Sequence, residues 1–363
     1  MQARGRRRPE TRALAGLCVV VGLGGCSGGA PAETETASAT AATEATDTSG
    51  STTAGSTTGA GAGWVQSLQA GTEHGAFLSV WGPSPSEVYA VGGQLGDDSH
   101  GTVMRYDGAA WTEVALPDGT PSLNWVYGVD GELWVVGYEG AALRREGDGW
   151  VTTPTPTTSM LWGVWGSAKD ELWAVGGDAV DDAPVLLRWD GAAWAEVALP
   201  AIDPDCHGLF KVWGSAADDV TIVGDRGVTL RYDGASWSAS DSGSIADLIS
   251  VWGPGDATRV AVGGRANGRV ARWDGAAWTG ETLAIPGLNG VWVDDAGVAT
   301  IVGWQGYVAT VQPGAFEPVQ EDSDTPLLLH AVYGFAGGPR FAVGGSLQSA
   351  PPFVGVIVMD PGE

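Results

Sequence analysis

The sequence predicts an all-β protein, a seven-bladed β-propeller with four-stranded blades, from three observations. The 363 residues include 58 Gly and 18 Trp but only 17% charged residues, a composition typical of short strands joined by tight turns. A Val-aromatic motif, usually followed by Gly, recurs seven times at steps of 38 to 48 residues. Each of the first six motifs is followed by enough chain for three more strands, as a four-stranded propeller blade requires. The aromatic residues of the motif are Trp81, Tyr127, Trp165, Trp213, Trp252, Trp292 and Tyr333.

Each repeat divides into four short strands, A to D, as the first repeat illustrates. Strand A carries Val80-Trp81-Gly82, and strand B is an alternating run that ends in Val-Gly at residues 91 and 92. Strand C ends in Asp107-Gly108, a dipeptide that favours a tight hairpin, and strand D begins at Trp111. One such sheet cannot cover both of its faces, so we expect the sheets to bury Trp and Val against one another around an axis.

The two ends of the repeat array predict how the ring closes. The seventh repeat stops at residues 356–362, after its strand C and turn, and no Trp-led strand D follows. Residues 63–66 form an isolated strand D before the first repeat. We therefore expect the N-terminal strand to complete the last blade, which removes an open sheet edge that could pair with other chains.

The repeats resemble two known families. Residues 88–93 (Val-Tyr-Ala-Val-Gly-Gly), followed by Trp111, look like a kelch repeat, and the Asp-Gly-x-x-Trp turn is similar to the Asp-box of bacterial propellers. The resemblance covers residues 63–363 and implies the propeller fold. Copper oxidases of the kelch type need several His and Tyr at one metal. The four histidines here fall in different repeats, so we expect no metal and no cofactor.

The N-terminus predicts export and a lipid anchor. Residues 1–25 contain five Arg and a short apolar run at 14–22, and Leu23-Gly24-Gly25-Cys26 resembles a bacterial lipobox. In that family the cysteine is lipidated, which implies that Cys26 anchors the chain to the bacterial cell envelope. Ser27 follows the cysteine, which favours the outer over the inner membrane. The competing interpretation is an ordinary signal peptide with a chance cysteine.

The remaining chain divides into a linker and one domain. Residues 26–62 contain the cysteine and a Ser/Thr/Ala/Gly-rich stretch that cannot bury enough apolar surface to order, so we expect a disordered tether. Residues 63–363 form the propeller. Removing residues 1–25 takes five Arg and one Glu from 18 basic and 43 acidic residues, leaving a net charge of about −29.

This charge limits the classes of partner. A body so acidic repels phosphate backbones, which argues against nucleic-acid binding. Basic proteins and neutral ligands such as sugars fit it better. We therefore expect a monomer that meets the membrane through its lipid and binds an unknown protein or a glycan.

One variable position in strand A predicts a binding site. It follows the first apolar residue of each repeat, where the strand enters from the face that carries the B–C loops and the D–A connections, here called the loop face. We expect these side chains to line the mouth of the central channel, rimmed by carboxylates. The alternative is that they are ordinary cap residues. The seven mouth residues are Leu78, Asn124, Trp162, Phe210, Ile249, Asn289 and His330.

Acidic pairs in two long B–C loops give a second candidate site. Asp97 and Asp98 lie in the first repeat, and Asp181 and Asp182 lie in the third. Solvated loop acids or a calcium site would account for them. The sequence thus favours a non-catalytic binding scaffold that uses the loop face, with no catalytic residue identified. The alternative is a carbohydrate-active enzyme, a glycoside hydrolase or lyase, that uses the loop carboxylates.

Overall fold

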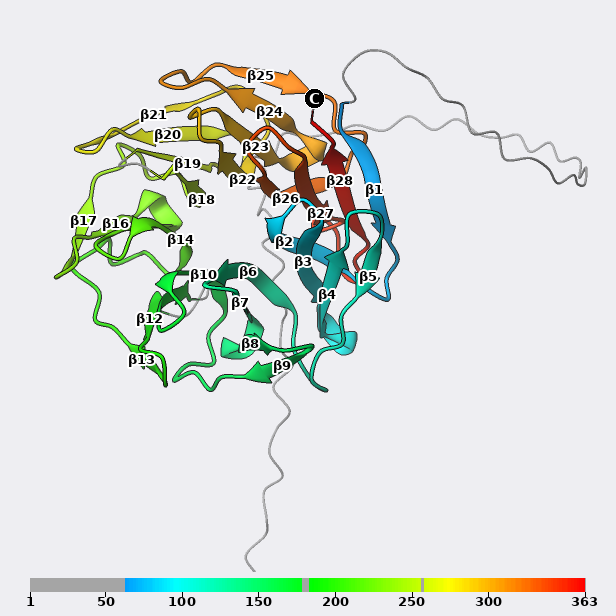
Figure 1. Ribbon diagram of the computed structural model, residues 1–363. Helices are drawn as coiled ribbons and strands as arrows, with labels where there is room; N and C mark the ends of the chain where they lie inside the picture. Colours follow the sequence, from blue (N-terminus) through cyan, green and yellow to red (C-terminus); the bar gives the residue numbers. More distant parts are fainter. Residues whose placement is uncertain (1–62, 178–182, 256–257, 363) are drawn as a thin grey trace, which may run out of the picture.

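The computed structural model describes residues 63–177, 183–255 and 258–362, and in them the chain forms seven four-stranded antiparallel sheets arranged around an axis. Figure 1 looks along this axis, with the first strand of each blade nearest the centre and the last at the outside. The predicted all-β, seven-bladed propeller is confirmed. Within the described residues the only helices are short 3₁₀ turns, and none is long and apolar enough to cross a membrane.

The first three blades follow the chain in strand order A-B-C-D. Blade 1 contains β2 (Ala76–Ser84), β3 (Glu87–Gln94), β4 (His100–Tyr106) and β5 (Trp111–Glu113). Blade 2 contains β6 (Leu123–Val129), β7 (Glu132–Gly137), β8 (Ala142–Glu146) and β9 (Gly149–Thr152). Blade 3 contains β10 (Leu161–Ala168), β11 (Glu171–Gly176), β12 (Val185–Trp189) and β13 (Trp194–Glu196).

The next three blades repeat this order. Blade 4 contains β14 (Leu209–Ala216), β15 (Asp219–Gly224), β16 (Thr229–Tyr232) and β17 (Trp237–Ser240). Blade 5 contains β18 (Leu248–Trp252), β19 (Arg259–Gly263), β20 (Arg269–Trp273) and β21 (Trp278–Thr282). Blade 6 contains β22 (Leu288–Val293), β23 (Ala299–Gly303), β24 (Val308–Val311) and β25 (Pro318–Glu321). The 3₁₀ turns are η1 (Gly96–Asp98), η2 (Tyr138–Gly140), η3 (Asp225–Gly227) and η4 (Trp304–Gly306).

Blade 7 joins the two ends of the described chain. It contains β26 (Leu328–Gly334), β27 (Arg340–Gly345) and β28 (Gly355–Asp360), and β1 (Val65–Ala70) pairs antiparallel with β28 as its outermost strand. Trp64, directly before β1, is buried, and its indole Nε1 donates to Glu321 Oε2 of blade 6 at 2.7 Å. The predicted closure by the N-terminal strand is confirmed.

The recurring aromatic-Gly pair joins neighbouring blades. A Cβ atom on Gly128 of blade 2 would lie 2.1 Å from the ring of Trp81 in blade 1, and one on Gly214 of blade 4 would lie 2.6 Å from the ring of Trp165 in blade 3. The glycine is therefore required because the aromatic ring of the preceding blade occupies the space of a side chain. The same contact occurs at Gly253 with Trp213 and at Gly334 with Trp292, so the motif supplies both halves of an inter-blade contact at four of the junctions.

The recurring Asp-Gly dipeptide is the hairpin between strands C and D. Asp107 Oδ1 accepts the backbone N–H groups of Ala109 and Ala110, each at 2.9 Å. These hydrogen bonds favour the charged form and lower the pKa of the carboxyl. The same arrangement occurs at Asp190, Asp233 and Asp274. These acids build turns.

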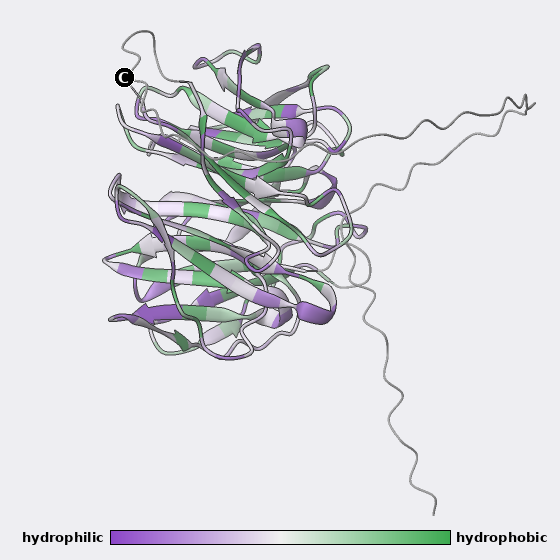
Figure 2. Ribbon diagram, turned by 90° about the vertical axis from the view of Figure 1, so that its right-hand side faces the viewer, coloured by the Kyte–Doolittle hydropathy of each residue, from purple (hydrophilic) through white to green (hydrophobic). Residues whose placement is uncertain are grey.

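The order of the strands assigns the loops to two faces. B–C loops and D–A connections emerge on the loop face, and A–B and C–D turns emerge on the opposite face, here called the turn face. Strand β1 begins and strand β28 ends on the turn face, so Gly63 and Gly362 lie there. Figure 2 shows the propeller from the side, with hydrophobic residues concentrated along the strands and hydrophilic residues at the edges.

Candidate functional site

Each mouth residue is the extra residue of a β-bulge. In blade 4, Leu209 pairs with Gly224 and Lys211 pairs with Val223, which leaves Phe210 without a partner on strand β15. The same register shift occurs at the equivalent position of strand A in all seven blades. A bulge redirects the side chain of its extra residue, which explains why this position varies while the residue before it is Leu or Phe in every blade.

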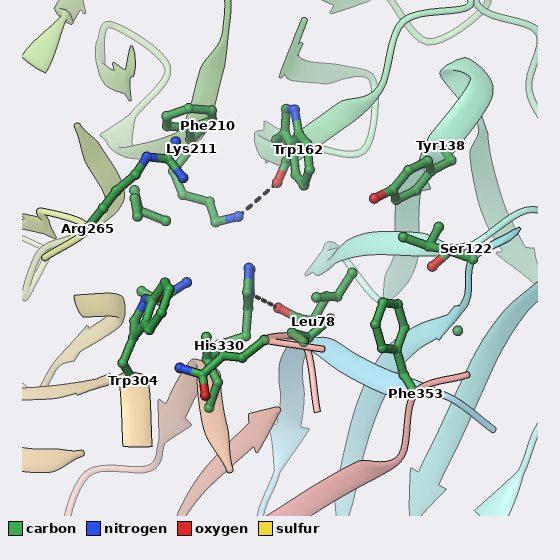
Figure 3. Close-up of a pocket in the computed structure, with 17 residues that line it drawn as sticks. Leu78, Ser122, Tyr138, Trp162, Phe210, Lys211, Arg265, Trp304, His330 and Phe353 are labelled. Atoms are coloured by element: carbon green, nitrogen blue, oxygen red, sulfur yellow. Dashed lines mark hydrogen bonds between the residues drawn. The ribbon is translucent and has the colours of Figure 1, made fainter. Parts of the chain in front are cut away.

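Six of the seven mouth residues line one pocket of about 140 Å³ on the loop face. Trp162 and Phe210 form one wall, with their rings edge to face and their centroids 6.4 Å apart. Leu78, Ile249, Asn289 and His330 complete the group (Figure 3). The volume exceeds that of several water molecules, so a small group can enter. That the pocket binds a ligand remains a prediction.

The seventh mouth residue, Asn124, is not part of the pocket lining. Its side chain is buried between blades, and its amide Nδ2 donates to the carbonyl oxygen of Leu161 in blade 3 at 2.9 Å. Asn124 therefore joins two blades, because the neighbouring carbonyl offers its amide a partner that the open pocket does not.

The B–C loops supply the rest of the pocket wall. Tyr138 begins η2 of blade 2 and Trp304 begins η4 of blade 6, and both line the pocket with Phe353 of blade 7. The sequence contained a signal for the first two: they directly follow the Val-Gly pair, where blade 1 has a second Gly. An aromatic residue at that place lines the pocket from the start of the B–C loop.

The charged side chains of the described lining are Lys211 and Arg265, and no Asp or Glu is among them. The carboxylate rim expected from the sequence is therefore not found there. Asp97 and Asp98 are exposed on η1 outside the pocket lining. Asp181 and Asp182 lie outside the described residues, as does Cys26. Among the residues that the structure describes, no three His, Cys, Asp or Glu gather as a metal site would require.

Lys211 is a charged residue of the pocket that the repeat pattern did not predict. It directly follows the bulge residue Phe210, and 3% of it is exposed. Its ammonium donates to the Trp162 carbonyl oxygen at 2.8 Å and lies 3.7 Å from the ring centroid of Trp125 in blade 2. Burial lowers the pKa of Lys211 to about 7. Among the described residues it forms no ion pair, in contrast to Arg265.

Arg265 is held by an acid outside the pocket lining. Its Nε donates to Asp247 Oδ2 at 2.5 Å, and the other oxygen of Asp247 accepts the backbone N–H of Arg226 at 3.0 Å. Asp225 lies beside Asp247, and burial together with this neighbour raises the pKa of Asp225. The carboxylate of Asp247 therefore neutralises and orients the guanidinium, which Figure 3 shows directed into the pocket beside Phe210 and Lys211.

His330 and Asn289 present hydrogen-bond acceptors. His330 Nδ1 lies 2.7 Å from the Leu78 carbonyl oxygen, and because a carbonyl only accepts, Nδ1 carries the proton (Figure 3). Burial, with the charge of Lys211 adding to it, lowers the pKa of His330 to about 3, so the ring is neutral and Nε2 has a free lone pair. Asn289 Oδ1 is buried with no hydrogen-bond partner among the described residues.

Comparison with solved structures identifies the fold. The chain is similar to "YCF48 bound to D1 peptide", with a TM-score of 0.61 and 16% identity over 83% of this chain and 97% of that one. It is equally similar to YCF48 from Cyanidioschyzon merolae, with a TM-score of 0.61 and 14% identity over 83% and 99% of the chains. For the WD40 propeller domain of Doa1 the TM-score is 0.62, with 11% identity over 82% and 97%. The chain is a seven-bladed β-propeller. At these identities the likeness shows the fold alone.

Comparison of sequences does not assign a family. No protein-family model matches the chain. A methionyl-tRNA formyltransferase of Verminephrobacter eiseniae (strain EF01-2) is 31% identical over an alignment of 167 residues, and the alignment covers 36% of this chain. The chain covers 47% of that relative, about half its length.

Proposed function

We propose that this chain is a non-catalytic binding protein that takes its ligand, part of a protein or a glycan, at the pocket on the loop face. The observation that carries the proposal is the convergence of bulge residues from six blades on one largely apolar pocket. Such concave apolar sites with a few polar groups are typical of ligand binding. A propeller of the same fold is described as bound to a peptide, which supports a protein segment as the ligand.

A comparison of variants tests the pocket. The full chain and a Trp162→Ala/Phe210→Ala variant are applied to peptide and glycan arrays, and we expect the variant to lose at least about tenfold in affinity for the ligands that bind. Val319→Ala is the matched control, because Val319 is 62% exposed on the outer strand β25. Trp304→Ala is a second pocket variant in a loop, and circular dichroism checks that each variant is folded. Equal binding by all of them would remove the pocket as the site.

We further propose that the protein is exported and anchored by a lipid on Cys26 to the bacterial cell envelope, in the outer membrane, with the propeller as a monomer. The basic and apolar segments before Leu23-Gly24-Gly25-Cys26 support this. Growth of a bacterial host with labelled palmitate tests it. The wild-type chain is expected to take up label and to sediment with outer membranes, and Cys26→Ser to do neither. Label retained by Cys26→Ser would contradict the proposal.

The kelch-like or Asp-box-like type of repeat is also part of the proposal. The Asp-Gly-x-x-Trp hairpin with its doubly accepting carboxylate supports it. The glycosidase alternative gains no support from the described residues, because it needs two carboxyl groups beside one bond and no acid lines the described pocket. The formyltransferase similarity covers too little of either chain to extend that activity to this one.

A further inference from the structure

The position of Lys211 is occupied by a charged residue in blade 4 alone. At the same place, directly after the bulge, the other blades carry Ser79, Trp125, Gly163, Ser250, Gly290 and Ala331. Residues that build the repeat would recur in it, so Lys211 has a role that the fold does not require. Burying an ammonium group without a counter-ion costs free energy, and such groups are concentrated at functional sites.

The ammonium of Lys211 has spare hydrogen-bonding capacity at the pocket. It has three N–H donors, and the Trp162 carbonyl is the one acceptor that the described residues offer it, at 2.8 Å. Figure 3 shows the ammonium directed toward the middle of the pocket, opposite Leu78 and His330. The ring of Trp125, 3.7 Å away, stabilises the charged form without using a donor. A ligand in the pocket can therefore accept hydrogen bonds from a cation that is already in place.

Below about pH 7, where Lys211 is protonated, the charges around the pocket add up to one uncompensated positive charge. Arg265 is paired with Asp247, His330 is neutral, and Lys211 has no carboxylate partner among the described residues. One positive charge matches a monoanion and not a doubly charged phosphate. The apolar walls match an apolar body, and the acceptor oxygen of Asn289 can take one donor from the ligand.

We infer that the pocket binds a carboxylate-bearing ligand, with its carboxylate on the ammonium of Lys211 and its apolar or aromatic body against Trp162, Phe210 and Ile249. This inference rests on the proposed function, that the pocket is the binding site, and names the chemical class of the ligand. A charge-assisted hydrogen bond away from water is strong enough to decide between a carboxylate and its neutral isostere.

The chain offers a direct readout, because it contains two lysines and Lys169 is exposed on blade 3. The full chain with isotope-labelled lysine is studied by NMR with acetate, benzoate and phenylacetate, each beside its neutral amide. We expect benzoate or phenylacetate to bind at least about tenfold more tightly than its amide and to raise the pKa of Lys211. The NMR signals of the Lys169 side chain should not respond to these ligands. Lys211→Met is expected to reduce carboxylate binding to the level of the amide, and Lys169→Met to leave it unchanged.

Several outcomes separate this inference from the proposed function. If acids and amides bind equally and Trp162→Ala/Phe210→Ala abolishes both, the carboxylate assignment is wrong and the pocket stands as a binding site. If no probe binds at millimolar concentration, or if Lys211→Met retains the preference for acids, the inference is overturned. The peptide and glycan arrays with the pocket variants then test separately whether the pocket is the binding site.

Discussion

Replacing Lys211 with methionine is expected to stabilise the folded protein at neutral pH. Burial lowers the pKa of Lys211 from 10.5 to about 7, so the unfolded chain binds this proton more tightly than the folded one. The penalty is complete below pH 7, where the lysine is charged in both states. It disappears as the pH rises from about 7 to 10.5, because the folded protein loses the proton first. Methionine, of similar length and no charge, has no such penalty.

The size of the effect follows from this pKa difference and from the contact that is lost. Each pKa unit corresponds to about 1.4 kcal/mol, which gives an upper limit of about 5 kcal/mol for the penalty. Methionine leaves the Trp162 carbonyl without its donor, at a cost of about 1–3 kcal/mol. We therefore expect Lys211→Met to be more stable than the wild type by about 2–4 kcal/mol at pH 6. This advantage should shrink by about 2 kcal/mol between pH 7 and 9.

Urea unfolding at several pH values measures the difference. Far-UV circular dichroism and Trp fluorescence are followed together, and coincident transitions justify a two-state free energy. The other titrating groups are common to both proteins and cancel in the difference. Lys169→Met, which removes the exposed lysine, is the matched control. A Lys211→Met difference from the wild type that is constant between pH 7 and 9 would refute the reasoning.

Three further predictions use the same unfolding assay. Trp64→Ala removes the buried indole of the closing strand and should cost about 3–5 kcal/mol, and a loss below about 1 kcal/mol would show that closure does not depend on it. Asp219→Asn removes the ion pairs of this carboxylate with Arg231 and with the buried guanidinium of Arg259 and should cost about 1.5–3 kcal/mol, whereas exposed Asp98→Asn should cost almost nothing; equal effects would contradict this. His330 has a folded pKa of about 3, below its unfolded value of 6.5, so its contribution to stability is complete above pH 6.5 and is lost toward pH 3. By pH 4 the loss should reach about 3 kcal/mol and be absent in His330→Gln, and parallel acid curves for the two proteins would count against it.

The fold could be predicted because the residues that make the contacts between blades recur as a motif in the sequence. The Trp81–Gly128 contact shows why: the aromatic residue and the glycine that receives it recur together, so the inter-blade packing is visible as a motif. The closing strand was predictable for a similar reason, since Trp64 begins a strand D that has no repeat of its own. Repetition therefore carried the information about architecture.

The site was less predictable because it depends on what does not repeat. The variable bulge position located six lining residues, but the burial of Asn124 depends on the Leu161 carbonyl of the next blade. The cationic character was missed because Lys211 is surrounded by residues from other blades, including Trp125. A signal was available: one of only two lysines lies between Phe210 and Val212 in an apolar strand.

The position of Gly63 on the turn face places the attachment point of the linker on the side of the propeller opposite the pocket. With Cys26 as the proposed anchor, the linker would join the propeller at its turn face. The loop face, with Trp162 and Lys211, would then tend to lie on the side away from the membrane. Lipids of the same bilayer would then be poorly placed to enter the pocket. Molecules dissolved in the surrounding medium, or projecting from an opposing surface, would reach it first.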